Sequence, residues 1–239
     1  MYVGNNGTGF ATKLLGYLQQ ADYRIAESAK DREKIYRMRY EAYRREDSIR
    51  QNASRMFTDA YDNFDNCWIF GIFLNDQLAS SIRFHVISPD NRKGPAIDVF
   101  PDIVSPMIDQ GMTLIDPTRF VAEESAIQEY PEISYMTLRA ATMAYEYFKA
   151  DYCLVTVRKE HAAFYRRVFK AELGCEPRPY PSLKAPICLL KIDVRNFREE
   201  ITRRYPIFES SLTERRMLFE QRAQSDASAF PDYIQPLAS

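Results

Sequence analysis

The chain has 239 residues, of which 46% are hydrophobic and 13% aromatic, and its 32 basic residues nearly balance its 33 acidic ones. This length and apolar content suffice for one large domain, with or without an appendage, that folds without disulfide or metal staples. The net charge of -1 excludes a global basic field. Nucleic acid is therefore not an expected partner, and any charged partner must meet a local patch.

The four cysteines lie far apart, inside or beside apolar runs, and none has the paired spacing of a metal or redox site. We expect buried free thiols at Cys67, Cys153, Cys175 and Cys188 and no metal. The N-terminus lacks a signal-peptide pattern, and no run approaches the ~20 apolar residues of a membrane span. A cytoplasmic protein without a transmembrane segment is the resulting prediction.

Residues 1–22 are predicted to be a flexible N-terminus. A short strand follows at 23–26, and Ser28 with Asp31 resembles a helix cap that predicts a polar helix to Asp47. Arg39 and Tyr43 stand one turn apart on one face of this helix.

Residues 67–73 are apolar on both faces, and a second strand at 79–87 follows the Asn75-Asp76 turn, which predicts a hairpin inside a sheet. Ile82 and Phe84 share one face of the second strand, and Arg83 lies on the other. Arg83 is thus either a rim residue or a charge that faces a cleft.

Residues 88–111 contain four prolines and are predicted to be a long connection with about one helical turn. Strand character returns at 112–115 and resumes at 120–122, interrupted by Asp116-Pro117-Thr118-Arg119. A proline within a strand indicates an edge or a bulge, and we place the bulge at Pro117. Because a bulge resets the alternation of side chains, Asp116 and Arg119 can both face one cleft.

A helix at 133–147, a strand at 151–157, a helix from Glu160 to Gly174 and a strand at 185–194 complete a mixed α/β domain, which we delimit to residues 23–194. The crossover unit should be right-handed. Residues 195–223 predict a C-terminal extension of one or two helices, and 224–239 a loosely ordered tail.

Charges of both signs fall within segments that otherwise indicate core. Such charges are costly unless they pair with one another or serve a site. For the two aspartates of the loop before residue 67, turn and cap chemistry is the alternative. The charged residues are Arg39, Asp62, Asp65, Arg83, Asp116 and Arg119.

The order and spacing of four motifs resemble a known family over residues 24–194. They are Arg39, Asp62-x-x-Asp65, Ser81-Ile82-Arg83-Phe84 and Asp116-x-x-Arg119-Phe120. The chain resembles the acyl-homoserine-lactone (autoinducer) synthases and, more closely, the long-chain N-acyl amino acid synthases. The resemblance implies an α/β fold of the GNAT-like N-acyltransferase type, with a mixed central sheet, flanking helices and a C-terminal helical extension.

Three departures refine this resemblance. Ile49 stands where the lactone enzymes usually have a tryptophan, and residues 161–167 and 178–186 look like the N-acyl amino acid synthases. Acetyl-CoA enzymes of this fold bind pyrophosphate on a glycine-rich loop, but residues 122–128 contain no glycine and two acids. We therefore expect the acyl-phosphopantetheine of acyl carrier protein as donor, with acyl-CoA less favoured and no permanently bound cofactor.

The resemblance also implies roles. In GNAT relatives strands four and five splay apart, the pantetheine arm enters between them, and the thioester lies at the bulge. Asp116 becomes the candidate base for the amine, with a capping role as the alternative, and Arg119 belongs to the same centre. Tyr165 stands where many GNAT enzymes keep a tyrosine that protonates the leaving thiolate, with core packing as the alternative.

A charged cluster beside that centre is the candidate acceptor site, because an arginine fork suits the α-carboxylate of an amino acid. The alternative is an ion-pair network that orders the first helix against the sheet. The candidate residues are Arg39, Tyr43, Asp62, Asp65 and Arg83.

A basic cluster surrounds the helix that starts near Glu160. It fits docking of an acidic acyl carrier protein, and a solvated helix face is the alternative. The cluster consists of Arg158, Lys159, Arg166, Arg167 and Lys170.

The sequence therefore predicts an enzyme that transfers a long acyl group from acyl carrier protein to the amine of an amino acid. One alternative is an acyl-homoserine-lactone synthase that uses S-adenosylmethionine. Another is a non-catalytic GNAT-fold module that binds acyl carrier protein or an acylated ligand.

Overall fold

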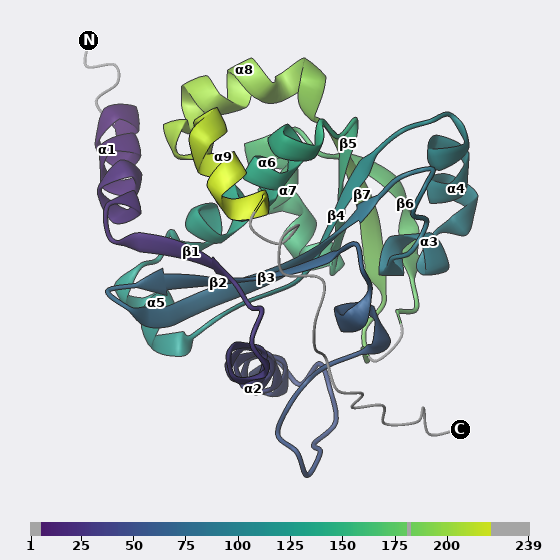
Figure 1. The fold of residues 1–239 in the computed structure, drawn as a ribbon, viewed down its shortest axis with the longest axis horizontal. Helices are drawn as coiled ribbons and strands as arrows, with labels where there is room; N and C mark the ends of the chain where they lie inside the picture. The colour runs from purple at the N-terminus through teal and green to yellow at the C-terminus, as the bar shows by residue number, and fades with distance from the viewer. Residues whose placement is uncertain (1–5, 181–182, 221–239) are drawn as a thin grey trace.

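The computed structural model describes residues 6–180 and 183–220. Within these residues one seven-stranded sheet has the order β1-β2-β3-β4-β5-β7-β6 (Figure 1). Only the β4–β5 pair is parallel, so the mixed sheet agrees with the predicted fold. The strands are β1 (Ala21–Ile25), β2 (Cys67–Leu74), β3 (Gln77–Ile87), β4 (Leu114–Ala122), β5 (Tyr152–Val157), β6 (Glu172–Arg178) and β7 (Ile187–Asp193).

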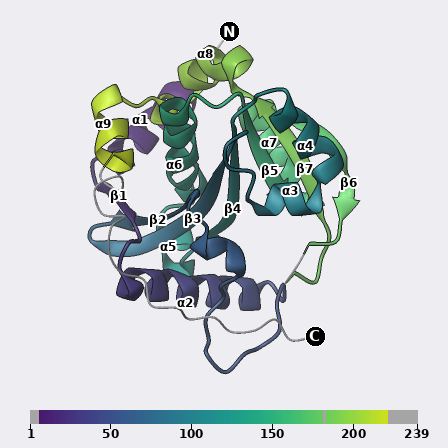
Figure 2. The same cartoon turned by 45° about the vertical axis from the view of Figure 1, so that its right-hand side comes forward.

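Helices cover both faces of the sheet (Figures 1 and 2). The face that we call the α2 face carries α2 (Ala29–Arg45), α3 (Pro95–Val99) and α4 (Pro101–Asp109). The opposite face, the α6 face, carries α6 (Ile133–Phe148), α7 (Ala162–Phe169), α8 (Val194–Arg204) and α9 (Leu212–Phe219). The short α5 (Glu124–Glu129) links β4 to α6.

Several expected elements are confirmed with small shifts of their bounds. Ser28 caps α2 by accepting a hydrogen bond from the backbone N–H of Asp31, as the cap pattern predicts. The hairpin of β2 and β3 pairs Phe70 with Ile82 in the centre of the sheet. α6 and β5 also form where the apolar patterns place them.

Two segments that we expect to lack helices, or nearly so, are helical. Residues 6–18 of the predicted flexible N-terminus form α1 (Asn6–Leu18), whose Leu14 is fully buried in the core against α6. Residues 88–111 form two helices, α3 and α4, instead of about one turn. Pro95 and Pro101 start these helices, because the first helical position needs no N–H.

The end of α7 is also misplaced by the sequence prediction. The helix ends at Phe169, and Lys170 adopts the left-handed conformation at its C-cap. Gly174 lies instead within β6, a strand that was not predicted. A Cβ atom at Gly174 would lie 3.1 Å from the carbonyl oxygen of Leu189, so the glycine serves close strand contact.

A bulge in β4 lies later than expected. Pro117 pairs regularly with Phe84, whereas the register shifts between Arg83, opposite Thr118, and Ser81, opposite Val121. Arg119 therefore lies within the bulge, with φ +54°, a region that non-glycine residues rarely adopt. The bulge brings Arg119 to the same face of the sheet as Asp116.

The strands β4 and β5 separate soon after they meet. Their pairing includes Leu114 with Tyr152 and Ile115 with Cys153, and no further pair. Beyond Ile115, both strands continue without bonding to each other. An opening therefore crosses the sheet next to the bulge.

The C-terminal extension folds back onto α6. It comprises α8, the short η3 (Pro206–Phe208) and α9. Arg139 of α6 holds it, because its guanidinium donates to the carbonyls of Ile207 at 2.7 Å and Glu209 at 2.8 Å and pairs with Glu214 at 2.7 Å. The division into domain and extension at residue 194 stays a prediction, and the predicted tail at 224–239 lies outside the described residues.

Among the described helices, none combines the length and apolar character that crossing a bilayer requires.

We predict that Arg139→Met lowers the free energy of unfolding by about 2–4 kcal/mol, because two carbonyls and the Glu214 carboxylate lose their partner. The exposed Arg216, which pairs with Glu220, provides the control, since Arg216→Met should change stability by less than about 0.5 kcal/mol. Urea denaturation of both variants checks this. Equal stabilities would contradict the role of Arg139 as the clamp.

Candidate active site

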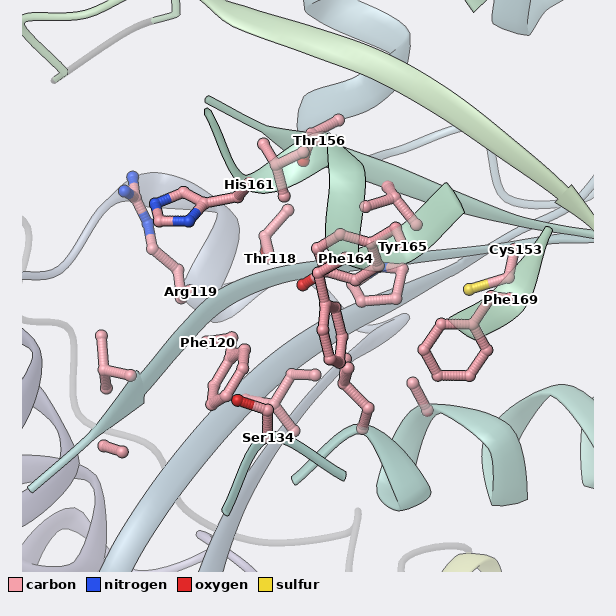
Figure 3. A pocket seen from close by; sticks show the side chains of 18 of the residues that line it. Thr118, Arg119, Phe120, Ser134, Cys153, Thr156, His161, Phe164, Tyr165 and Phe169 are labelled. Carbon is pink, nitrogen blue, oxygen red and sulfur yellow. The ribbon is translucent and has the colours of Figure 1, made fainter. Parts of the chain in front are cut away.

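A cavity of about 530 Å³ occupies the opening between β4 and β5 (Figure 3). It receives side chains from both faces of the sheet. Those on the α6 face include Ile82, Leu138, Ala141 and Phe169, and those on the α2 face include Tyr43, Thr156, Leu183 and Ile187. The cavity therefore passes through the sheet and connects its two sides.

The part of the cavity on the α6 face is mostly apolar. Leu138 and Ala141 of α6, Phe169 of α7, and Ile201 and Phe208 of the C-terminal extension line it. Such a slot favours a hydrocarbon chain, because each buried methylene contributes about 0.8 kcal/mol.

Polar groups gather where the cavity crosses the sheet. Figure 3 shows Thr118 and Arg119 of β4, Thr156 of β5 and Tyr165 of α7 around it. Tyr165 is 8% exposed, and burial raises the pKa of its hydroxyl well above the ordinary value. The Tyr165 hydroxyl therefore stays protonated at neutral pH.

Arg119 is the arginine of the predicted cluster that reaches the cavity. Its Nε and Nη2 donate to Asp59 Oδ2 at 3.2 and 2.5 Å, whereas its Nη1 makes no hydrogen bond within the described residues. Burial alone would lower the pKa of Arg119, but Tyr43 and Asp59 raise it above the ordinary value. One N–H edge of a permanently charged guanidinium is thus available to a ligand.

A second, small cavity of about 30 Å³ adjoins the first at Arg119. Tyr43, Thr118, Thr156 and Tyr180 contribute to its wall. Among the described residues, the buried Tyr180 hydroxyl has no hydrogen-bond partner, a costly state unless a ligand or water satisfies it. This corner on the α2 face is suited to a polar ligand group.

Three of the predicted acceptor residues, Arg39, Asp62 and Arg83, form a buried ion-pair network behind Arg119. Arg39 Nη1 lies 2.7 Å and Arg83 Nη1 2.9 Å from Asp62 Oδ1, and Arg83 also contacts Asp59. Arg39 and Arg83 are 0% and Asp62 1% exposed, and none of the three lines the cavity. This geometry matches the alternative of a network that orders α2 and its loop against the sheet.

Asp59 is the member of this network that sequence reasoning missed. It forms a capping box with Asp62, so the Asp-x-x-Asp spacing that matters is Asp59 to Asp62. Asp65 lies outside the network, 66% exposed, with Asn91 and Lys93 as partners. The predicted inclusion of Asp65 in the cluster is therefore wrong, and the capping-box pattern was the signal that could have found Asp59.

Asp116, the candidate base, does not line the cavity. It is fully buried on the α2 face, and its Oδ2 accepts a 3.0 Å hydrogen bond from the backbone N–H of Ala96 in α3. Its Oδ1 has no partner in the part of the chain that the structure describes, and burial raises the pKa of the carboxyl to about 7. Asp116 thus anchors α3 to β4, a capping role, although the cap is on a helix and not on the bulge.

The basic cluster lies beside one mouth of the cavity, which Arg158 and His161 line. Lys159, Arg166 and Arg167 are exposed. Arg158 instead pairs with Glu46 of the α2 C-cap at 2.7 Å, across the opening, and Lys170 pairs with Glu200 at 3.0 Å. Three of the five predicted docking residues are therefore solvent-facing cations without a carboxylate partner in the described structure.

The family model described as FeeM, N-acyl amino acid synthase FeeM, matches residues 34–193, which is well over half of the chain. The chain belongs to this FeeM family. The resemblance stated from the motifs is thereby confirmed, and the protein is an acyltransferase. A comparison with curated proteins gave no match.

Solved structures agree on the fold. FeeM, an N-acyl amino acid synthase from uncultured soil microbes, superposes with a TM-score of 0.63 at 14% identity, over 75% of this chain and 93% of that chain. MesI, a CoA-dependent acyl-homoserine lactone synthase, superposes with a TM-score of 0.55 at 17% identity, over 80% of this chain and 97% of that chain. LasI, another lactone synthase, superposes with a TM-score of 0.54 at 10% identity, over 72% of this chain and 89% of that chain. These identities show the shared GNAT-like fold alone.

We predict that Asp62→Asn destabilises the protein by about 3–5 kcal/mol, since the buried Arg39 loses its carboxylate partner and the buried Arg83 keeps only Asp59. Burial alone would raise the pKa of Asp62, but Arg39 and Arg83 lower it below the usual range. Its stabilisation is therefore complete above about pH 4 and is lost as pH falls toward the folded-state pKa. Urea denaturation between about pH 2 and 7 should show this decline in wild type and less of it in the variant.

Asp65→Asn is the matched control, because this exposed aspartate lies in the same loop. It should change stability by less than about 0.5 kcal/mol. A similar loss in both variants would contradict the network.

Asp116 should have the opposite pH effect. Its folded-state pKa of about 7 exceeds the ordinary value of 3.8, so the native state retains a proton that the unfolded state releases. This carboxyl therefore reduces stability as pH rises from about 4 to about 7. Asp116→Asn retains an acceptor for Ala96 and should remove that decline, measured by denaturation at about pH 5 and pH 8, whereas an unchanged pH dependence would contradict it.

Proposed function

We propose that the protein joins a long acyl group, delivered as a thioester of acyl-carrier phosphopantetheine, to the amine of an amino acid. The observation that supports this most is the cavity that crosses the sheet, with an apolar part on the α6 face and a polar corner on the α2 face. Such a shape separates a hydrocarbon chain from a charged acceptor. The thioester carbonyl then lies between them, at the bulge.

The donor arm fits the opening between β4 and β5. After Ile115, β4 has no partner strand on this side, so its backbone groups can bond an extended chain that carries amides. A pantetheine arm has that character. Its sulfur would lie near Thr118 and Tyr165, which both line the cavity.

The acceptor fits the polar corner. Nη1 of Arg119 and the unpartnered Tyr180 hydroxyl can bind the α-carboxylate of an amino acid, since charge-assisted hydrogen bonds to carboxylates are strong and directional. Arg39 and Arg83 act indirectly here. Arg83 donates to the Thr118 hydroxyl and pairs with Asp59, which in turn holds Arg119, whereas Arg39 pairs with Asp62.

The residues suggest how the reaction proceeds. The neutral amine attacks the thioester carbonyl, the C–N bond forms, and the C–S bond breaks. Tyr165 donates a proton to the departing sulfur, and the proton lost by the amine restores the tyrosine through water at the mouth. Asp116 is enclosed under α3, so we assign it a structural role and not that of the base.

One assay tests the proposal. Purified protein is incubated with acyl carrier protein thioesters, acyl-CoA thioesters, the amino acids and S-adenosylmethionine, and products are identified by mass spectrometry. We expect an N-acyl amino acid formed from the carrier-bound donor. An acyl-homoserine lactone would instead support the lactone-synthase alternative, and no product the non-catalytic alternative.

Tyr165→Phe should lower kcat at least about tenfold, because the leaving thiolate loses its proton donor. The variant removes one hydroxyl and keeps the ring that packs on Phe164 and Phe169, so its Tm should match wild type. Steady-state kinetics with saturating donor measures the effect. A kcat within about twofold of wild type would make Tyr165 a packing residue.

Charge reversal should reveal the docking site. Arg166→Glu with Arg167→Glu should raise the KM for acyl carrier protein at least about tenfold and leave the KM for acyl-pantetheine unchanged. Lys30→Glu is the matched control, because this exposed lysine lies at the other end of α2, about 24 Å from the mouth by helix rise. Unchanged carrier kinetics after the reversal would contradict docking at α7.

A further inference from the structure

The C-terminal extension forms part of the cavity wall. Among its described side chains, five line the cavity on the α6 face, and all of them follow residue 193, where the match to the FeeM family model ends. Ile201 is 5% and Phe208 3% exposed. The five residues are Val194, Arg198, Ile201, Thr202 and Phe208.

The cavity follows α6 for much of that helix. Ser134 lies near its N-terminal end and Glu146 near its C-terminal end, and both line the cavity. At 1.5 Å per residue they are about 18 Å apart along the axis. With carbon–carbon bonds of ~1.5 Å at ~111°, an extended alkyl chain advances about 1.25 Å per carbon, so this length would hold at most about 14 carbons.

The end near Glu146 is polar and blocks a longer chain. Glu146 forms an ion pair with Arg198 of α8, and the Thr202 hydroxyl donates to the Arg198 carbonyl at 3.0 Å. A methyl terminus that passed Ile201 would have to displace or desolvate this pair, which is unfavourable. The apolar path therefore ends where the extension crosses α6.

The position of this wall is fixed by the clamp described above. Arg139 bonds the carbonyls of Ile207 and Glu209, the residues on either side of Phe208. Phe208 is thus held at both neighbouring peptides while its ring packs at a tilt against Phe169 of α7, with centroids 5.0 Å apart. A rigid wall can discriminate between acyl chains of different length, whereas a mobile wall would adapt to each chain.

We infer that Ile201 and Phe208 of the C-terminal extension determine the length of the acyl chain that the protein accepts. The inference rests on the proposed function only in that the chain on the α6 face is the transferred acyl group. The specificity-determining residues thus lie outside the segment that defines the family. Chains up to about 14 carbons fit the cavity.

Ile201→Trp tests the inference by shortening the cavity. A mixture of carrier thioesters from about 6 to about 16 carbons competes for one acceptor, and the product profile is read by mass spectrometry. The ratio of the longest to the shortest product should fall at least about tenfold, because two or more methylenes lose their contacts. Glu199→Trp is the matched control, since Glu199 is exposed on the same helix, and it should leave the profile unchanged.

Phe208→Ala tests the opposite direction. It should shift the profile toward longer chains, whereas Phe219→Ala removes an equally buried ring of the same extension that does not line the cavity. Circular dichroism confirms that each variant is folded, and if Ile201→Trp is not, Phe208→Ala decides. Wild-type profiles in the folded cavity variants would overturn the inference.

A binding measurement separates the two proposals. Fatty acids of the same lengths displace a fluorescent fatty acid from the protein without any reaction. If wild type forms no N-acyl amino acid but Ile201→Trp shifts the preferred fatty acid to shorter chains, the proposed function fails and this inference stands. If products form but neither profile changes in the variants, the inference alone is overturned.

Discussion

Three buried arginines, the buried Asp62 and the partly buried Asp59 determine where β4 lies. Asp62 neutralises Arg39 and Arg83, and Asp59 joins Arg83 to Arg119. Charges this deeply buried are tolerated only when each has a partner, so the five groups impose one arrangement on the segments that carry them. They connect α2, the loop before β2, β3 and the bulge of β4.

The consequence is the opening between β4 and β5. Arg83 Nε donates to Thr118 Oγ1 at 3.0 Å, and Arg119 is held on Asp59, which keeps this part of β4 on its side of the gap. A regular strand would continue its pairing with β5 and close the sheet. The ion pairs therefore act on function indirectly, because they preserve a passage that connects an apolar slot with a polar corner.

Because the cavity passes through the sheet, the two faces of the sheet supply different contacts to it. The α6 face offers hydrocarbon contacts and a wall built by the C-terminal extension, and the α2 face offers Arg119 and two tyrosines. Of Arg39, Arg83 and Arg119, only Arg119 lines the cavity, since the bulge turns its side chain toward the network while its Nη1 edge stays available. The sequence offers several arginines that could bind the ligand, and the geometry favours Arg119 among them.

Much of the fold could be predicted from the sequence, because hydrophobic alternation and the Ser28 cap are local signals. The mixed sheet, α2, α6 and β5 follow from such patterns, and Arg83 and Arg119 were recognised as unusual charges. The bulge position, the burial of Asp116 under α3 and the part played by Asp59 depend on tertiary pairing, which the spacing of residues does not reveal. The amphipathic α1 was missed for the same reason, since Leu14 is buried only by contact with distant elements.

The sequence also does not predict that residues beyond 193 line the cavity. Ile201 and Phe208 lie in an arginine- and glutamate-rich segment that resembles a surface helix pair, and tertiary contacts, among them the bonds that Arg139 donates to Ile207 and Glu209, bring them to the cavity.

A crystal structure of the protein with an N-acyl amino acid product bound tests the central claim most directly. The account predicts an acyl chain along α6 that ends at Ile201 and Phe208, an amide between Thr118 and Tyr165, and a carboxylate within hydrogen-bond distance of Arg119 on the α2 face. A product that lies wholly on one face of the sheet, or a carboxylate bound away from Arg119, would contradict it.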